Sequence, residues 1–379
     1  MATVFPVPGY VTDNRRSLAK VDWYLVLATL ILLMVGLMSL YSKCASSNLP
    51  YFRKQLVNVG LGFVPLAVFA TVHPKFWQRV SKLLYAISLS LLMLVLIHGR
   101  HAKGAGRWIQ FGPIDFQPSE LTKIFTILTL ATFYTFRQDR IQKPSTFFYG
   151  LLHAIIPTLL VFRQPHLGGA MVMFCLWFVI TLIAGVPLRS MFVTLGLALS
   201  IIGLGLYVPN LGLIQPYQVK RLKAMLGIEA DAKGSIYQVE QAEIAFGVGG
   251  VMGTGFGRGD RKANGFIPEQ WNDFAFSIVG EEGGLIGGSL VLLTLGFFFY
   301  RIWLTIVQSS EPYYKMLAGG VFAVLGFHTV INIAMVLQLF PVVGIWLPFI
   351  SYGGTAIWLC MACVGLMIGI RRRERPILF

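Results

Sequence analysis

The sequence predicts an all-α polytopic membrane protein, with about ten transmembrane helices and one long folded loop between the seventh and the eighth. Of the 379 residues, 56% are hydrophobic and only 12% are charged, whereas a soluble domain carries roughly 25% charged residues. Long apolar runs recur between short charged clusters, and most approach the roughly 20 residues that a helix needs to cross a bilayer. Most of the chain is therefore expected to contact lipid or protein rather than water.

Ten apolar runs predict spanning helices. They lie near residues 22–42, 55–72, 77–97, 121–136, 148–162, 168–186, 190–208, 274–300, 316–340 and 353–370. The first run is too long for the apolar part of a signal peptide, so we expect it to remain as the first span. The whole chain, 1–379, is expected to form a single membrane domain. Its predicted hydrophilic parts are the cytoplasmic tails 1–21 and 371–379 and the extracytoplasmic loop 209–272.

Basic residues predict the orientation of these helices. Clusters at Arg15–Arg16 and at Arg371–Arg373 flank the first and last runs, which places both termini in the cytoplasm by the positive-inside rule. The same side receives the basic residues of short loops: Lys75, Arg79, Arg137, Arg140, Lys143 and Arg189. The net charge of +15 is spread in such clusters, so membrane lipids and anionic substrates are expected partners, and nucleic acid is not.

The long loop 209–272 is not of low complexity. Helical patterns at 215–226 and 235–246 precede a glycine-dense run at 247–259, so we expect the loop to fold onto the outer membrane face. By this topology the outer side also carries many basic residues. They form either an ordinary solvated surface or an anion site for a phosphorylated substrate.

A first set of polar residues opens the predicted span at 121–136. Pro118 and Ser119 can start a helix, with Ser119 as its cap and Glu120 in the favourable first turn. Glu120 and Lys123 are three residues apart and can form an ion pair on one helix face. The set is either a capped helix start or the wall of a polar cavity. Upstream, Arg107 would place a guanidinium at the membrane interface.

A second set of polar residues opens the predicted span at 274–300. Asp273, Glu281 and Glu282 place three carboxylates within ten residues. Favourable electrostatics in a first helical turn explains one of them, but not all three. Partial burial would raise the pKa of Asp273 and make it a more useful base near neutral pH.

A third set lies before the last span, in the run Leu347–Gly354. Proline and glycine so close to a span indicate a broken or re-entrant backbone, which membranes tolerate where it is buried in protein or lines a cavity. On the preceding span, three polar residues either face that cavity or serve as ordinary interhelical contacts: His328, Asn332 and Gln338.

Small residues in the spans predict packing rather than chemistry. Glycines spaced four residues apart predict close helix contacts: Gly280, Gly284 and Gly288. The cysteines lie in or beside apolar runs without metal-ligand spacing, so we expect core packing and no disulfide: Cys44, Cys175, Cys360 and Cys363.

Together the three sets resemble the SEDS family, which comprises RodA, FtsW and their sporulation relatives. The matching motifs are Arg107-Trp108-Ile109, Gln117–Glu120 with Lys123, Tyr217-Gln218 with Arg221, Tyr237-Gln238, Gly253–Phe256, Pro268-Glu269, Asp273-Phe274, Glu281–Gly284 and Leu347–Gly354. The turn 164–169 departs from the family pattern, because His166 stands where the family has aspartate and Gly169 where it has threonine. Asn272 likewise replaces a frequent threonine.

The resemblance implies a peptidoglycan glycosyltransferase of the bacterial inner (cytoplasmic) membrane, with its active site facing outward. Such an enzyme polymerises lipid II into β-1,4 glycan, releases undecaprenyl pyrophosphate and works with a class B penicillin-binding protein as transpeptidase. The short N-terminal tail and Gly353-Gly354-Thr355 favour RodA, and hence cell elongation, over the division protein FtsW.

These residues suit inverting glycosyl transfer, which needs a base for the acceptor hydroxyl. A pyrophosphate leaves as an anion and needs positive charge rather than a proton. We assign Asp273 as general base. The expected substrate-binding residues are Arg107, Glu120, Lys123, Arg221, Lys223 and Ser351, with Arg107, Arg221 and Lys223 near the pyrophosphate. A divalent cation, Mg²⁺ or Mn²⁺, could share that role.

Two other functions fit parts of the same pattern. A flippase for the lipid-linked precursor would use intramembrane charges and a broken helix for alternating access. A non-catalytic scaffold of the wall-synthesis complex would not depend on Asp273.

Overall fold

The computed structural model describes residues 21–47, 50–98, 100–102, 105–111, 114–207, 235–259, 265–267 and 270–374. Within these ranges each predicted span corresponds to one long helix. These helices are α2 (Trp23–Ser47), α3 (Tyr51–Thr71), α5 (Ser81–His98), α6 (Pro118–Thr135), α7 (Pro144–Arg163), α8 (Leu167–Ala184), α9 (Leu188–Tyr207), α13 (Ala275–Gln308), α14 (Pro312–Val336) and α15 (Gly354–Arg373). Shorter helices are α4 (Pro74–Arg79), η1 (Gln138–Arg140) and α11 (Ser235–Gly249).

The multi-pass helical membrane fold is confirmed, but the count of ten spans stays a prediction. In the described part of the chain, eight helices are long and apolar enough to cross a membrane. The other two long helices are α6 and α9. Helix α6 carries a buried Glu120–Lys123 pair and five threonines, and α9 is a shorter apolar helix over Leu188–Ser200.

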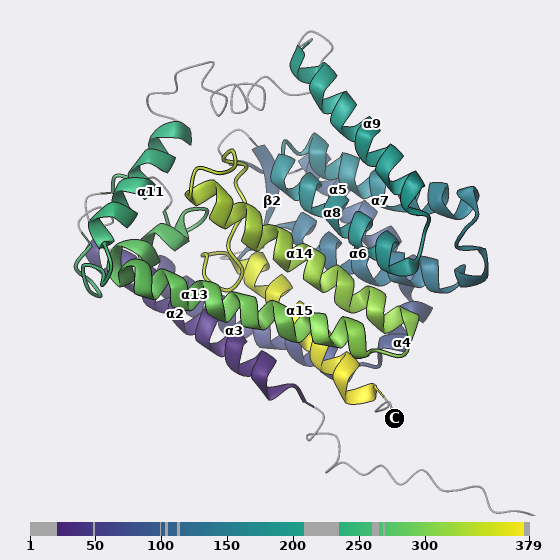
Figure 1. Cartoon of the computed structure of the whole chain (residues 1–379), viewed down its shortest axis with the longest axis horizontal. Helices are drawn as coiled ribbons and strands as arrows, with labels where there is room; N and C mark the ends of the chain where they lie inside the picture. Colours follow the sequence, from purple (N-terminus) through teal and green to yellow (C-terminus); the bar gives the residue numbers. More distant parts are fainter. Residues whose placement is uncertain are drawn as a thin grey trace, which may run out of the picture.

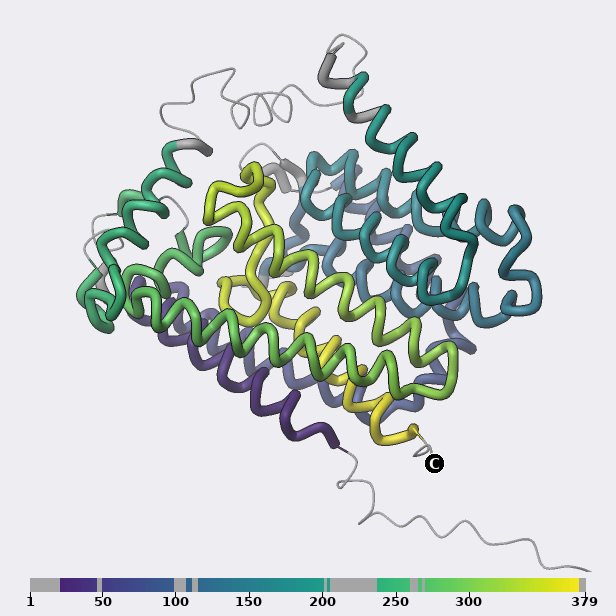
Figure 2. The backbone as a smooth tube through the Cα atoms, viewed as in Figure 1, coloured from purple at the N-terminus to yellow at the C-terminus, as the bar shows by residue number. Residues whose placement is uncertain are grey.

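Helix α15 lies in the middle of the bundle, where it packs against α3, α6 and α14 (Figure 1). The tube in Figure 2 shows this yellow helix passing behind α13. Nearly all its residues from Thr355 to Ile370 are buried. The peripheral helices instead expose large apolar side chains, such as Met34, Leu83 and Leu293. This inside-out distribution is expected of helices whose outer faces meet lipid.

Ion pairs define one end of the bundle, which we call the Asp22 end. Asp22, just before α2, binds Arg301 near the end of α13 with N–O distances of 2.8–3.1 Å. Arg371, in the last turn of α15, lies 3.7 Å from the same carboxylate. The chain therefore enters α2 and leaves α15 at one end. Because α13 begins immediately after Asp273 and reaches Arg301, Asp273 lies at the opposite end, which we call the Asp273 end.

The loop between α6 and α7 belongs to the Asp22 end. Helix α6 starts beside α15, where the Gln117 amide donates to the Thr355 hydroxyl at 3.3 Å. The two helices start together and pack against each other, and both contact α4. Lys75 of α4 pairs with Glu311 at the start of α14 at 3.3 Å. The geometry thus gathers the basic short loops at one end, as predicted.

A small antiparallel sheet precedes α6 and was not among the predicted elements. Its strands are β1 (Arg100–Ala102), β2 (Ala105–Phe111) and β3 (Ile114–Phe116), in the order β1-β2-β3. The register pairs Arg100 with Trp108 and Ile109 with Phe116. The polar stretch between α5 and α6 was interpreted as a loop. Its alternation of apolar and polar residues and its Gly-Pro turn signal were therefore overlooked.

The described parts of the long loop pack onto α13. The predicted helical pattern at 235–246 forms α11, which contacts α13 and α14, while the pattern at 215–226 lies outside the described residues. A Cβ at Gly280 would overlap the Phe246 ring, so the predicted close packing holds at Gly280. It does not hold at Gly288, where the nearest atom to an added Cβ would lie at 3.8 Å.

Helix α13 is broken at Gly284, where φ is 61° and ψ is −159°. The segment after α11 fills the break. Thr254 and Gly255 donate their amides to the carbonyls of Glu281 and Glu282, and the amides beyond the break donate to Gly250 and Val251, at 2.9–3.2 Å. The loop therefore satisfies backbone groups that the break removes from the helix, which a membrane protein requires.

Candidate functional site

Asp273 lies in a turn, residues 271–274, that leads into α13. Its side chain is partly buried, and one carboxylate oxygen approaches Gly344. The Asn332 amide donates to the Asp273 carbonyl and to the Ile345 carbonyl, both at 2.7 Å. A single side chain on α14 therefore ties the turn to the segment that precedes α15. This fixes the backbone at Asp273 on a rigid helix.

The predicted irregular segment Leu347–Gly354 forms the other wall of this turn. The Ser351 hydroxyl donates to the Asn272 carbonyl at 2.6 Å and accepts from the Leu347 amide at 2.7 Å. The Tyr352 amide donates to the Trp271 carbonyl at 2.8 Å. Most of the segment is buried, as expected for broken backbone inside a membrane protein.

Three partly exposed aromatic rings border the same turn. Tyr51 lies 4.9 Å from Trp271 and 5.1 Å from Tyr352, measured between ring centroids. Burial, aided by the nearby Asp115 carboxylate, raises the pKa of Tyr352 to about 12. Its hydroxyl therefore stays protonated and can donate a hydrogen bond in the neighbourhood of Tyr51 and Asp115.

Glu120 and Lys123 form a fully buried ion pair at 2.7 Å. The Lys123 ammonium also lies 3.0 Å from Nε2 of His328 and 5.4 Å from the centre of the Trp346 ring. The His328 ring stacks on Trp346 at 3.8 Å. Within the described residues, Glu120 Oε2 is buried without a hydrogen-bond partner in the protein, whereas the His328 ring interacts with the backbone of Trp346.

Helix α14 connects the ion pair to the Asp273 turn. His328, which contacts Lys123, and Asn332, which holds Asp273, are four residues apart and so share one helix face. Both side chains face the residues that lead into the irregular segment, Asn332 through the Ile345 carbonyl and His328 through the Trp346 ring. Gln338 does not face it, because its amide donates to Glu243 of α11 at 2.5 Å.

The start of α6 differs from the prediction by one residue. The helix begins at Pro118, with Gln117 in the capping position and no side-chain cap. Ser119 is inside the first turn, and among the described residues its buried hydroxyl has no hydrogen-bond partner, so the prediction that it caps α6 is wrong. Proline at the first helical position has a suitable φ and no amide to satisfy, which moves the start upstream.

Arg107 binds backbone rather than standing free at the interface. From β2 it donates to the carbonyls of Gln164, at 3.1 Å, and Pro165. It therefore holds the turn before α8, where His166 is buried. Burial, and secondly the charge of Arg107, keep the pKa of His166 well below its usual range. A Cβ at Gly169 would lie 2.5 Å from the His166 ring, so the two departures from the family pattern are sterically linked.

The two glutamates of the second set serve the loop and α2. Glu281 is fully buried, and its carbonyl accepts from Thr254. The Glu282 carboxylate accepts from the Ser42 hydroxyl at 2.5 Å and from the Gly257 amide at 3.1 Å. The two glutamates therefore hold the glycine-dense loop in place, a role that the sequence did not predict.

The structure brings Asp273 and Ser351 into direct proximity and links them through α14 to Glu120 and Lys123. Arg221 and Lys223 lie outside the described residues. In the part of the chain that the structure describes, no three His, Cys, Asp or Glu side chains gather as metal ligands. Trp346, which sequence reasoning passed over, lies one residue before the irregular segment, and an aromatic residue next to that signature was its only signal.

The fold and the site define a class: a helical membrane protein with a carboxylate at the mouth of a spanning helix, backed by a buried polar network. The profile of the FtsW/RodA/SpoVE family, described as "Cell cycle protein", matches residues 19–376. The chain belongs to this family.

Similar proteins cover almost the whole chain. It is 35% identical to the stage V sporulation protein E of Bacillus subtilis strain 168, over 93% of this chain and 98% of that relative. It is 31% identical to the peptidoglycan glycosyltransferase MrdB of Escherichia coli K12, over 96% and 98%. The predicted family is confirmed, and the chain is a membrane glycosyltransferase.

Solved structures share the fold. Rod shape determining protein RodA of Thermus thermophilus has a TM-score of 0.70 at 26% identity, covering 97% of this chain and 99% of RodA. A chain from a peptidoglycan synthase complex that coordinates polymerization and crosslinking has a TM-score of 0.78 at 28% identity, covering 93% and 98%.

Proposed function

We propose that this chain polymerises lipid II into β-1,4 peptidoglycan strands with Asp273 as general base. The observation that carries the proposal is the position of Asp273. Its turn is clamped between α14 and the irregular segment before α15 by Asn332, Ser351 and Tyr352. A carboxylate held in this way at the mouth of a helix can approach a substrate hydroxyl without first being ordered.

In the proposed reaction, Asp273 takes the proton of an acceptor sugar hydroxyl as its oxygen attacks the anomeric carbon of the donor. The new glycosidic C–O bond forms while the bond to the pyrophosphate oxygen breaks, with inversion at the anomeric carbon. The bonding electrons leave with undecaprenyl pyrophosphate, which needs no proton. The rings of Tyr51, Trp271 and Tyr352 offer apolar faces beside the turn on which a sugar can pack.

Cationic groups have the second role, stabilising the charge that develops on the departing pyrophosphate. Lys123 is a buried cation that is linked to the clamped turn through His328 and Asn332 on α14. Arg107 holds the 164–165 turn through two backbone contacts, so we assign it a positioning role in addition to its proposed substrate contact. Arg221 and Lys223 remain proposed pyrophosphate contacts.

We further propose that the Asp22 end is cytoplasmic and the Asp273 end faces outward. The Asp22 end gathers Lys75, Arg79, Arg137, Arg140, Lys143, Arg189 and Arg371–Arg373. Such an excess of basic residues in short loops marks the cytoplasmic side. In the bacterial inner membrane this orientation leaves both termini inside and puts the Asp273 site on the side where wall polymer is made.

The proposed partner is a class B penicillin-binding protein that crosslinks the new strands. Support comes from the similar chain that occurs in a complex coordinating polymerization and crosslinking. We favour a RodA-like role in elongation over a division role. A divalent cation remains a proposal without an assigned step, because the described residues lack a three-ligand cluster.

The decisive experiment compares purified full-length protein and its Asp273→Asn variant on lipid II, with glycan products separated by gel. We expect polymer to fall by at least about a hundredfold, the scale of general-base catalysis, with an unchanged thermal unfolding midpoint. Asp139→Asn is the matched control, because it makes the same change at an exposed carboxylate at the Asp22 end, away from the Asp273 turn. Wild-type polymerisation by Asp273→Asn would refute the proposal.

The same assay separates the two alternatives. A flippase would move lipid II across vesicles without making polymer, and a scaffold would show neither activity. Adding a chelator, and then Mg²⁺ or Mn²⁺, tests the cation. Loss and recovery of polymer would establish its requirement, and unchanged synthesis would exclude it.

A further inference from the structure

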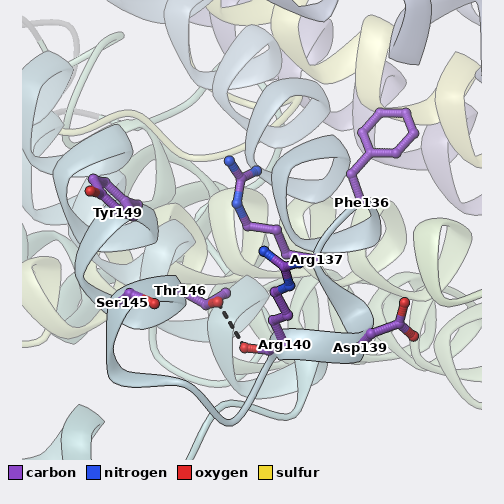
Figure 3. A pocket seen from close by; sticks show the side chains of 7 residues that line it. All are labelled: Phe136, Arg137, Asp139, Arg140, Ser145, Thr146 and Tyr149. Atoms are coloured by element: carbon purple, nitrogen blue, oxygen red, sulfur yellow. Dashed lines mark hydrogen bonds between the residues drawn. The ribbon is translucent and has the colours of Figure 1, made fainter.

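A cavity of about 590 Å³ lies at the Asp22 end, far from the Asp273 turn, between the loop after α6 and the first turns of α7 (Figure 3). It is lined by Phe136, Arg137, Asp139, Arg140, Ser145, Thr146 and Tyr149. All of its lining residues except Thr146 are exposed, so it is an open hollow at the protein surface. The proposed catalytic step does not use it.

The charge of the lining suits an anion. Two arginines and one aspartate give the lining one net positive charge. In Figure 3 the Asp139 carboxylate lies at the right, and both guanidinium groups lie to its left. The positive end of the α7 dipole adds to this potential, because Ser145 and Thr146 belong to the first turn of that helix. Planar guanidinium groups and hydroxyls are the donors that bind phosphate oxygens in proteins.

The loop that carries the arginines is held in place before any ligand binds. The Arg137 guanidinium lies 4.1 Å from the Phe133 ring centre. The Thr146 hydroxyl donates to the Arg140 carbonyl at 2.7 Å. The amides of Gln138 and Gln142 donate to the carbonyls at the end of α8, at 3.3 and 2.9 Å. A loop fixed at both sides loses little entropy when a ligand binds.

An apolar track leads from the cavity along α7 toward the Asp273 end. Tyr149, Leu152, Ile156 and Leu159 follow one another at intervals of three and four residues, and 54%, 41%, 37% and 53% of their surfaces are exposed. Such spacing forms one stripe on a helix. Phe136, 72% exposed, flanks the cavity itself. An acyl chain could lie along this stripe while its headgroup occupies the cavity.

We propose that this cavity binds the phosphodiester headgroup of an anionic glycerophospholipid of the same leaflet, with Arg137 and Arg140 as the phosphate ligands and the α7 stripe as the acyl contact. Basic pockets between helices on the cytoplasmic side are typical sites for anionic lipids. A free phosphate would use the same arginines but would gain nothing from the stripe.

The test uses the full chain in nanodiscs of phosphatidylcholine with equal phosphatidylglycerol, and counts lipids retained on the protein by native mass spectrometry. We expect retained phosphatidylglycerol on the wild type and on the control Arg79→Ala/Arg189→Ala, which removes two exposed arginines from the same end. The amount of phosphatidylglycerol retained on Arg137→Ala/Arg140→Ala should be at least about tenfold lower than on the wild type. Arg137→Lys/Arg140→Lys, which keeps the charge but not the planar fork, should be intermediate.

Two results would overturn the proposal. Equal retention by the wild type and the double alanine variant, with both proteins folded by thermal melting, would show that the arginines are not the ligands. Competition by inorganic phosphate or by acyl-free glycerophosphoglycerol as strong as that of phosphatidylglycerol would show a soluble phosphate ligand instead. Because binding is measured without lipid II, the outcome does not depend on the proposed polymerase activity.

Discussion

The two ends of the bundle are held together by different kinds of contact. At the Asp22 end, charges pair with charges: Arg301 binds both oxygens of Asp22, Arg371 lies close by, and Lys75 binds Glu311. At the Asp273 end, polar side chains and loop amides bind backbone carbonyls. Asn332 and Ser351 do so around Asp273, and residues 254–255 do so at the break in α13.

The contacts at the Asp22 end therefore stabilise the fold, whereas those at the Asp273 end position the proposed catalytic residue. Ion pairs between the ends of α2, α13 and α15 close the Asp22 end, and their carboxylates are occupied by cations. At the Asp273 end the clamp acts through carbonyls, and Asn332 fixes the backbone of Asp273 through its carbonyl oxygen. Irregular backbone at membrane depth is characteristic of sites that bind substrates and ions.

The largest effect on polymerisation after Asp273 itself should come from Asn332→Leu. The variant removes both amide bonds and leaves two buried carbonyls, of Asp273 and Ile345, without that donor. A small displacement of a catalytic group costs about a hundredfold in rate, so we expect a loss of that order in the lipid II gel assay. Gln338→Leu, the same change at an exposed amide on the far side of the segment, should stay near wild type. Wild-type polymerisation by Asn332→Leu would show that the clamp at the Asp273 end is not needed for the reaction.

An intermediate effect is expected from Gly284→Ala. The residue has φ 61°, and an added Cβ would overlap the Gly253 amide nitrogen. This combination of φ and ψ is essentially restricted to glycine and costs another residue about 1–3 kcal/mol, and the clash should also push the 250–255 loop away from α13.

Thermal melting and limited proteolysis of the loop can measure this change. Gly296→Ala is the control on the same helix, because nothing lies within 4 Å of its added Cβ; its melting should be unchanged or slightly raised. If Gly284→Ala matched Gly296→Ala in both measurements, the glycine would not be needed at the break.

The smallest effect on polymerisation should come from Asp22→Asn. Asp22 is 1% exposed and Arg301 17% exposed by side chain, so losing the charge should lower the free energy of unfolding by about 1–3 kcal/mol. We expect a lower melting temperature but a rate per folded molecule within about twofold of wild type, since surface and structural pairs act on stability rather than on chemistry. A rate loss comparable to that of Asn332→Leu would show that the Asp22 end also contributes to the reaction.

Much of the fold and part of the site could be predicted from the pattern of residues. Apolar runs located each long helix, because lipid requires continuous apolar segments whose backbone bonds are internal. Leu347–Gly354 was correctly interpreted as buried irregular backbone, since proline and glycine there cannot continue a helix. Helix α6 starts one residue before the predicted position, because Pro118 is better suited than Ser119 to the first helical position. The sheet β1-β2-β3 was not predicted, because short strands between spans leave a weak signal in the sequence.

By itself the sequence determined the membrane class, the positions of the helices, the family motifs and the carboxylate Asp273 at the mouth of a span. These are local properties, encoded in runs of neighbouring residues. Only the tertiary structure decided that Asn332 holds Asp273, that Lys123 meets His328 and Trp346, and that a glycine loop fills the break in α13. Those contacts join residues far apart in the chain, and their geometry depends on how the helices pack against one another.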